Sequence, residues 1–163
     1  MKSLHIPIRA TAPDFPLSPG DMTGLRLSSL RGAPVILLFY RGHWCQSCRR
    51  QLSQVASVYE TIRALDSELV AVSADTREST REAAEARAWP FPLVSDPGLT
   101  IIDRYGLRDD ADQAGRRIAR PATFILDADG IVRFCHVGVD RQDRPAIGAI
   151  LLALESLSGA RVV

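Results

Sequence analysis

The stretch that decides the fold is Pro34–Gln51, which reads PVILLFYRGHWCQSCRRQ. Its first part, Val35–Tyr40, is a run of apolar and aromatic residues rich in β-forming types, and it predicts a strand buried on both faces of a sheet. Gly42 ends that pattern, and from Cys48 onward apolar residues recur at steps of three and four, which is typical of a helix. Cys45 therefore falls at the predicted junction of strand and helix, and Cys48 on the inward face of the first turn.

Two thiols at this spacing can close a disulfide across one helical turn, and the free N–H groups of a helix start stabilise a thiolate. Basic side chains are expected to surround the thiols and lower a thiol pKa: Arg41, His43, Arg49 and Arg50. For Arg49 and Arg50 the alternative is that they are solvated side chains at the start of the helix. His43 has a second interpretation as a local proton carrier, because its unperturbed pKa lies near neutrality. Trp44 is expected to shield the thiols and line the substrate surface, with plain packing as the alternative.

The bulk composition indicates an ordinary globular protein. The 163 residues carry a formal net charge of +1, with 46% hydrophobic and 24% charged residues, and are expected to form a single domain spanning 1–163. Nothing in this balance points to nucleic acid or a membrane surface, and no signal peptide or membrane span is predicted. A cytoplasmic location is expected, where three cysteines favour redox or metal chemistry over a structural disulfide framework.

The remaining pattern predicts a mixed α/β architecture. An N-terminal hairpin is expected around SPGDMTG, and a helix is expected to run from Cys45 to about Leu65. The other expected elements, in order, are a strand at 69–74, a helix from about 76 to 88, a strand at 92–95, a short helix after 97, a surface loop at 106–119, a hairpin of strands 122–126 and 131–137, and a helix after 145. This order implies a central mixed sheet with helices on both faces.

RGHWCQSCR resembles the WCxxC site of thioredoxin-like dithiol proteins. APDFPL, FYR and FILDADGIVRF resemble the peroxiredoxin (AhpC/TSA) family, and the combination is most similar to a peroxiredoxin-like branch that carries a CxxC. The resemblance covers roughly residues 11 to 155. It implies a thioredoxin fold with an N-terminal hairpin extension, and thiol redox chemistry without a metal or organic cofactor.

The two analogies disagree about the nucleophile. Thioredoxin-like chemistry implies that Cys45 attacks and Cys48 resolves. In the peroxiredoxin pattern of a proline, a threonine and the peroxide-attacking cysteine, Cys48 takes the place of that cysteine. Cys45 then stands where the threonine is expected, and Arg41 where the proline is expected.

RPATF gives a second comparison with the two families. Peroxiredoxins carry an arginine three residues before this phenylalanine, where Pro121 stands here, and Arg120 lies one step earlier. Thioredoxin-fold dithiol enzymes have a cis-proline at the matching place, so the resemblance predicts a cis Arg120–Pro121 bond close to the thiols, with an ordinary trans-proline as the alternative. Arg120 or Arg41 could still supply the charge that a peroxidase needs.

The sequence thus predicts a Cys45–Cys48 dithiol/disulfide cycle. Thiol–disulfide exchange is the leading interpretation and hydroperoxide reduction the alternative, with Cys135 taken as a small hydrophobe rather than a resolving thiol. A copper metallochaperone using Cys45, Cys48 and His136 is a third hypothesis. The implied partners are a disulfide or hydroperoxide substrate and a thiol reductant such as thioredoxin or glutathione, and the resemblance leaves room for a homodimer.

Overall fold

The computed structural model describes residues 4–18, 24–110, 112 and 114–159. Its centre is a five-stranded sheet with the strand order β3-β2-β1-β6-β7. The strands are β1 (Val35–Phe39), β2 (Glu68–Ser73), β3 (Leu93–Ser95), β6 (Ala122–Leu126) and β7 (Val132–Val137). β1 pairs parallel with β2 and antiparallel with β6, so the predicted mixed sheet of the thioredoxin fold is confirmed.

The central strand is buried on both faces, as its apolar run predicts. Val35, Leu37 and Phe39 join one hydrophobic cluster, while Ile36, Leu38 and Tyr40 join another on the other side of the sheet. Because side chains alternate along a strand, the second set lies on the face toward which the chain turns as it enters the first helix. We call this the α1 face.

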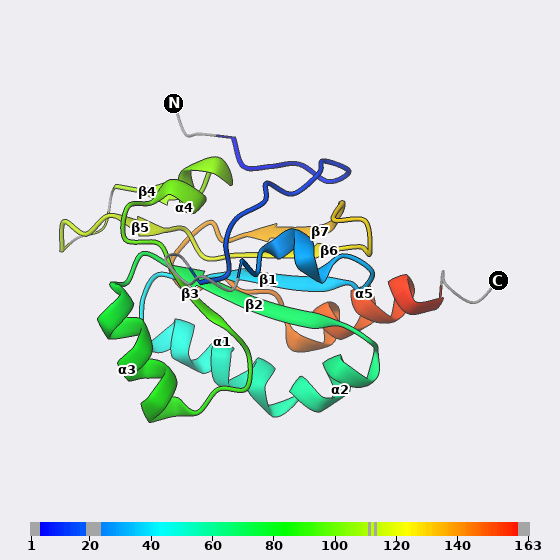
Figure 1. The fold of residues 1–163 in the computed structure, drawn as a ribbon. Coiled ribbons are helices and arrows are strands. Elements are labelled where there is room, and N and C mark those ends of the chain that lie inside the picture. The colour runs from blue at the N-terminus through cyan, green and yellow to red at the C-terminus, as the bar shows by residue number, and fades with distance from the viewer. Residues whose placement is uncertain (1–3, 19–23, 111, 113, 160–163) are drawn as a thin grey trace.

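Helices cover both faces of the sheet (Figure 1). α1 (Gln46–Ser57), α2 (Tyr59–Ala64) and α5 (Ile147–Gly159) contribute to the cluster on the α1 face, and α3 (Arg77–Arg87) runs on the same side. α4 (Thr100–Arg104) and the N-terminal segment cover the opposite face. Thr76 caps α3 by accepting a hydrogen bond from the backbone N–H of Ser79, as expected of this residue type.

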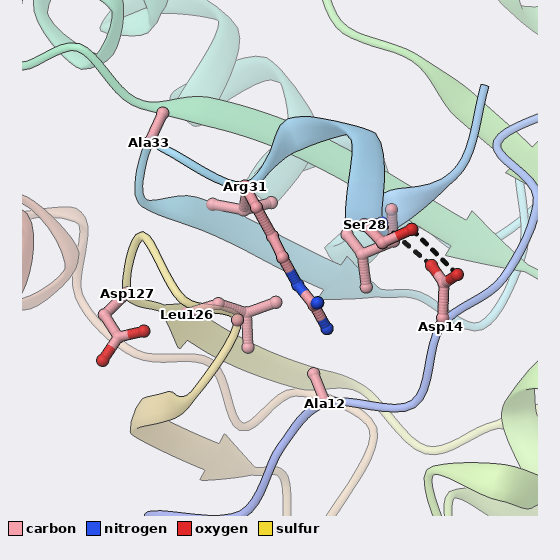
Figure 2. A pocket seen from close by; sticks show the side chains of 10 residues that line it. Ala12, Asp14, Ser28, Arg31, Ala33, Leu126 and Asp127 are labelled. Atoms are coloured by element: carbon pink, nitrogen blue, oxygen red, sulfur yellow. Dashed lines mark hydrogen bonds between the residues drawn. The ribbon is translucent and has the colours of Figure 1, made fainter.

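The N-terminal hairpin forms as a single antiparallel bridge. Leu17 and Leu27 donate backbone hydrogen bonds to Leu25 and Phe15, both at 2.9 Å, while the connecting residues 19–23 lie outside the described part. The 3₁₀ turn η1 (Leu27–Leu30) follows, and Asp14 anchors it by accepting from the backbone and hydroxyl of Ser28 (Figure 2).

A small cavity of about 10 Å³ lies beside this turn, and the guanidinium of Arg31 extends across it (Figure 2). Its walls include Val35 and Leu126, which pair at the end of β1 farthest from the thiols. A space of this size holds at most one water molecule, so we assign it no chemistry.

Two predicted elements are wrong in detail. The single helix from Cys45 to Leu65 is two helices, because Val58 leaves helical geometry (φ −111°, ψ 12°) and donates to Val55 rather than one residue further back. The predicted loop 106–119 contains a two-stranded ribbon of β4 (Arg108–Asp109) and β5 (Ile118–Ala119), whose apolar β5 residues are buried. No helix in the described residues is long and apolar enough to cross a membrane.

Candidate active site

Cys45 is the residue that caps the N-terminus of α1. Its backbone is extended (φ −83°, ψ 115°), and its Sγ accepts a hydrogen bond from the backbone N–H of Cys48 at 3.3 Å. A sulfur in this position satisfies one of the donors that a helix start leaves free, and it faces the positive end of the helix dipole. The side chain is only 5% exposed, so Cys45 is nearly buried, although it is more exposed than Cys48.

Cys48 lies one turn further along and is fully buried against the sheet, in the cluster that also holds Leu52. Its Sγ accepts two hydrogen bonds, one from the backbone N–H of Arg41 at 3.3 Å and one from Nη2 of Arg144 at 3.1 Å. The second donor is a cation, and charge-assisted hydrogen bonds favour the negative form of the acceptor. Cys48 is therefore buried away from solvent but already provided with donors for a thiolate.

The two thiols are electrostatically linked, and their pKa values separate. The pKa of Cys45 is lowered to about 5, first by the hydrogen bond from the Cys48 thiol, then by the Cys48 N–H and the guanidiniums of Arg41 and Arg144, against an opposing effect of burial. The pKa of Cys48 is raised, first by the same bond to Cys45 and then by burial, while Arg144 opposes the rise. The two opposite shifts favour a singly protonated pair in which Cys45 carries the negative charge.

A polar wall built around Trp44 borders the thiols. The guanidinium of Arg41 lies 3.9 Å from Cys45 Sγ through Nη1 and pairs with Asp112 at 3.0 Å through Nη2. Asp112 also binds Arg116 at 2.8 Å, and the Arg116 guanidinium sits 3.3 Å from the centre of the Trp44 ring. Trp44 is 37% exposed, so it borders the thiols and reaches solvent, while the carboxylate orients both guanidiniums.

The surroundings of His43 disfavour a positive charge on it, contrary to the expectation that it helps to lower a thiol pKa. Burial lowers the pKa of His43, against the opposing effect of Asp75, and Nε2 lies 3.2 Å from the Asp75 carboxylate. The backbone N–H of His43 also donates to Asp75, and Tyr40 Oη lies 3.3 Å from Nε2. The side chain is thus part of a buried polar cluster at the ends of β1 and β2.

The backbone at Arg120 and Pro121 differs from what the resemblance implies. The Arg120–Pro121 bond is trans, so the predicted cis bond is wrong, and with it the main argument for thioredoxin-type chemistry is lost. Pro121 precedes β6, where its carbonyl accepts from the N–H of Gly138, and Arg120 donates to the carbonyl of Gly106 at 2.6 Å. The guanidiniums that contact the thiols belong instead to Arg41 and Arg144.

Arg144 is the site residue that sequence reasoning missed as a thiol partner. It lies 96 residues after Cys48, in the segment between β7 and α5. No spacing rule links it to the thiols; only the packing of α5 against the α1 face brings it there. The preceding Asp143 holds this segment by pairing with His136 at 2.9 Å and accepting from the N–H of Val139.

The positions of Cys135 and His136 test the resolving-thiol and copper hypotheses. Cys135 packs with the cluster on the face opposite to Cys45 and Cys48, and its Sγ lies 3.7 Å from His5 Nδ1. His136 pairs with Asp143, and the described residues contain no group of three His, Cys, Asp or Glu side chains that could hold a metal ion. The three copper ligands that the hypothesis needs are not gathered there.

A CxxC pair at the start of a helix, directly after the central strand of a mixed sheet, defines a thiol-redox site on a thioredoxin fold. Comparison with known sequences gives the family: a sequence model of the AhpC/TSA family matches residues 8–135, and the chain belongs to this family.

The chain is similar to peroxiredoxin Q, chloroplastic, of Oryza sativa subsp. japonica, with 30% identity over 150 residues, which is 91% of this chain but only 66% of the rice protein. It is also 29% identical over 129 residues to thiol-disulfide oxidoreductase ResA of Geobacillus thermodenitrificans, covering 78% of this chain and 68% of that protein. Among solved structures, peroxidoxin BcpB from Mycobacterium tuberculosis superimposes with a TM-score of 0.76 at 25% identity, covering 96% of this chain and 99% of that one.

Proposed function

We propose that the protein is a thiol oxidoreductase in which Cys45 and Cys48 cycle between a dithiol and a disulfide, and that thiol–disulfide exchange is its principal reaction. The observation that carries this proposal is that the two thiols have different surroundings. Cys45 caps the helix among donors that lower its pKa, whereas Cys48 is fully buried, has a raised pKa and contacts Arg144. The relatives named peroxiredoxin Q and thiol-disulfide oxidoreductase ResA support thiol redox chemistry.

In the first step the Cys45 thiolate attacks one sulfur of a substrate disulfide. A new S–S bond joins Cys45 to that sulfur, the substrate S–S bond breaks, and the other substrate sulfur leaves as a thiolate. A pKa near 5 keeps Cys45 ionised at neutral pH, because the donors around it favour the charged form. The leaving thiolate then takes up the proton that Cys48 must lose.

In the second step Cys48 becomes the nucleophile. Once Cys45 is bonded to substrate, its sulfur is neutral, so the hydrogen bond that raised the pKa of Cys48 is lost. Arg144 and the backbone N–H of Arg41 remain, and both stabilise the Cys48 thiolate. Attack on Cys45 Sγ forms the intramolecular disulfide and releases the second substrate thiol.

Hydroperoxide reduction is the second candidate, and the position of Arg144 favours it. A guanidinium beside the sulfur pair could polarise the peroxide O–O bond. Cys45 thiolate would take the terminal oxygen to become a sulfenic acid, while the other oxygen leaves as an alcohol or water after protonation. Condensation with the Cys48 thiol then releases water and gives the same disulfide.

The two candidates are separated by presenting the reduced protein with hydrogen peroxide and, in parallel, with a protein disulfide such as that of insulin. The proposal expects faster oxidation by the disulfide, and loss of that reaction in Cys45→Ser. Faster oxidation by peroxide, with a dimedone adduct on either cysteine, would make the protein a peroxidase instead. The single domain over 1–163, the cytoplasmic location, the homodimer and the use of thioredoxin or glutathione as reductant stay predictions.

A further inference from the structure

A polar cavity of about 440 Å³ opens beside the thiol pair. It lies between the first two turns of α1 and the segment that precedes α5. The side chains that form it include Gln46, Arg50, Gln51, Gln54, Gln142 and Arg144. Arg144 belongs to both sites, because it lines the cavity and donates to Cys48 Sγ at 3.1 Å, so a molecule bound in the cavity lies one side chain away from the reactive sulfurs.

The chemistry of the lining selects the kind of ligand. It contains two guanidiniums, those of Arg50 and Arg144, and no carboxylate. Arg50 forms no ion pair with the residues that the structure describes, which leaves its charge available for an anion. The exposed amides of Gln46, Gln54 and Gln142 offer both donors and acceptors, which complement the N–H and C=O groups of a peptide backbone. The buried amide of Gln51 already donates to the hydroxyl of Thr123.

Arg144 is held in a fixed orientation within this lining. Its Nη1 donates to the backbone carbonyls of Arg141 and Asp143, at 3.0 and 3.1 Å, while Nη2 is directed to Cys48. Its Nε is buried and has no hydrogen-bond partner in the described part of the chain. Arg144 is therefore engaged with Cys48 and its own segment, and the exposed Arg50 is left to bind a charged group.

We propose that this cavity binds a small peptidyl thiol with at least one carboxylate, which reduces the Cys45–Cys48 disulfide. The proposal rests on the proposed dithiol cycle and names the reductant for it. Arg50 binds the carboxylate, the glutamines bind the amides, and the thiolate of the ligand attacks the disulfide to form a mixed disulfide. A second molecule then attacks that bond, so two thiols are oxidised to one ligand disulfide and the protein regains its two protons and two electrons.

The test compares reduction of the oxidised protein by glutathione with reduction by uncharged 2-mercaptoethanol, each rate corrected for its thiolate fraction. We expect glutathione to react about tenfold faster, and Arg50→Gln to lower this selectivity ratio roughly two- to fivefold, as loss of one exposed charge–charge contact implies. The matched control is Arg49→Gln, which removes the same charge from the neighbouring position outside the cavity lining and should leave the ratio unchanged.

A second measurement is independent of redox turnover. S-methylglutathione, which cannot react, should bind the reduced wild-type and Arg49→Gln proteins by calorimetry and bind Arg50→Gln several-fold more weakly. Equal loss in both variants would reduce the effect to general surface charge and overturn the site. If 2-mercaptoethanol or thioredoxin reduces the disulfide but glutathione has no advantage, the site fails while the dithiol cycle stands. If no Cys45–Cys48 disulfide forms at all, the proposed function fails and the site with it.

Discussion

Replacing Arg144 by glutamine removes the only guanidinium hydrogen-bonded to Cys48 among the described residues. A hydrogen bond to a charged group contributes roughly 1.5–3 kcal/mol, which corresponds to about one to two pKa units. Because Arg144 is half-buried rather than enclosed, we take the lower end. The thiolate of Cys48 in the mixed disulfide should then be about tenfold less populated, and resolution about tenfold slower.

Stopped-flow reaction with uncharged dithiodipyridine separates the two steps. The first thiopyridone is released when Cys45 attacks, and the second when Cys48 closes the disulfide. Arg144→Gln should slow the second release about tenfold and the first much less, because Arg144 donates its hydrogen bond to Cys48 and has only a small effect on the pKa of Cys45. Arg141→Gln, an exposed neighbour on the same segment, is the control and should match wild type. Equal slowing of both releases, or an unchanged second release, would refute the assignment of Arg144 to Cys48.

Three further outcomes are expected. The alkylation rate of Cys45 should be flat above about pH 6 and fall as pH drops through about 5, since protonation removes its thiolate. Cys48→Ala deletes the main cause of the lowered Cys45 pKa, so the midpoint of the alkylation–pH curve should move upward toward the usual thiol pKa. Cys135→Ser should leave both release rates unchanged in the same stopped-flow assay, because that thiol lies on the other face of the sheet. Gly42→Ala should alter Trp44 fluorescence and the rate of Cys45 alkylation, because the added methyl carbon would lie 2.2 Å from the indole nitrogen and displace the ring.

The sequence predicts the architecture well wherever the information is local. The run Val35–Tyr40 marks the central strand, and the apolar periodicity after Cys48 marks the helix and its buried face. Thr76 marks the start of α3 because its hydroxyl can cap a helix. The break at Val58 escapes prediction because nothing in the apolar pattern there is interrupted; only the backbone angles change.

The site is less predictable because its charge comes from a distant segment. The two thiols and Arg41 lie within one short stretch and are apparent from the sequence. Arg144 is brought to Cys48 only by the docking of α5, and Asp75 reaches His43 only because β2 ends beside β1. Pro121 differs for another reason: the resemblance implies a cis-proline at this position, whereas this chain has a trans bond there.

The central claim is that Cys45, not Cys48, is the attacking thiolate. The most direct test is brief treatment of the reduced wild-type protein at pH 7 with less than one equivalent of iodoacetamide, followed by peptide mass mapping. The wild-type protein is used because either cysteine variant alters the pKa of the other. We predict that nearly all of the label is on Cys45. A label found mainly on Cys48 would contradict the assignment and make Cys48 the nucleophile, as the peroxiredoxin pattern places it.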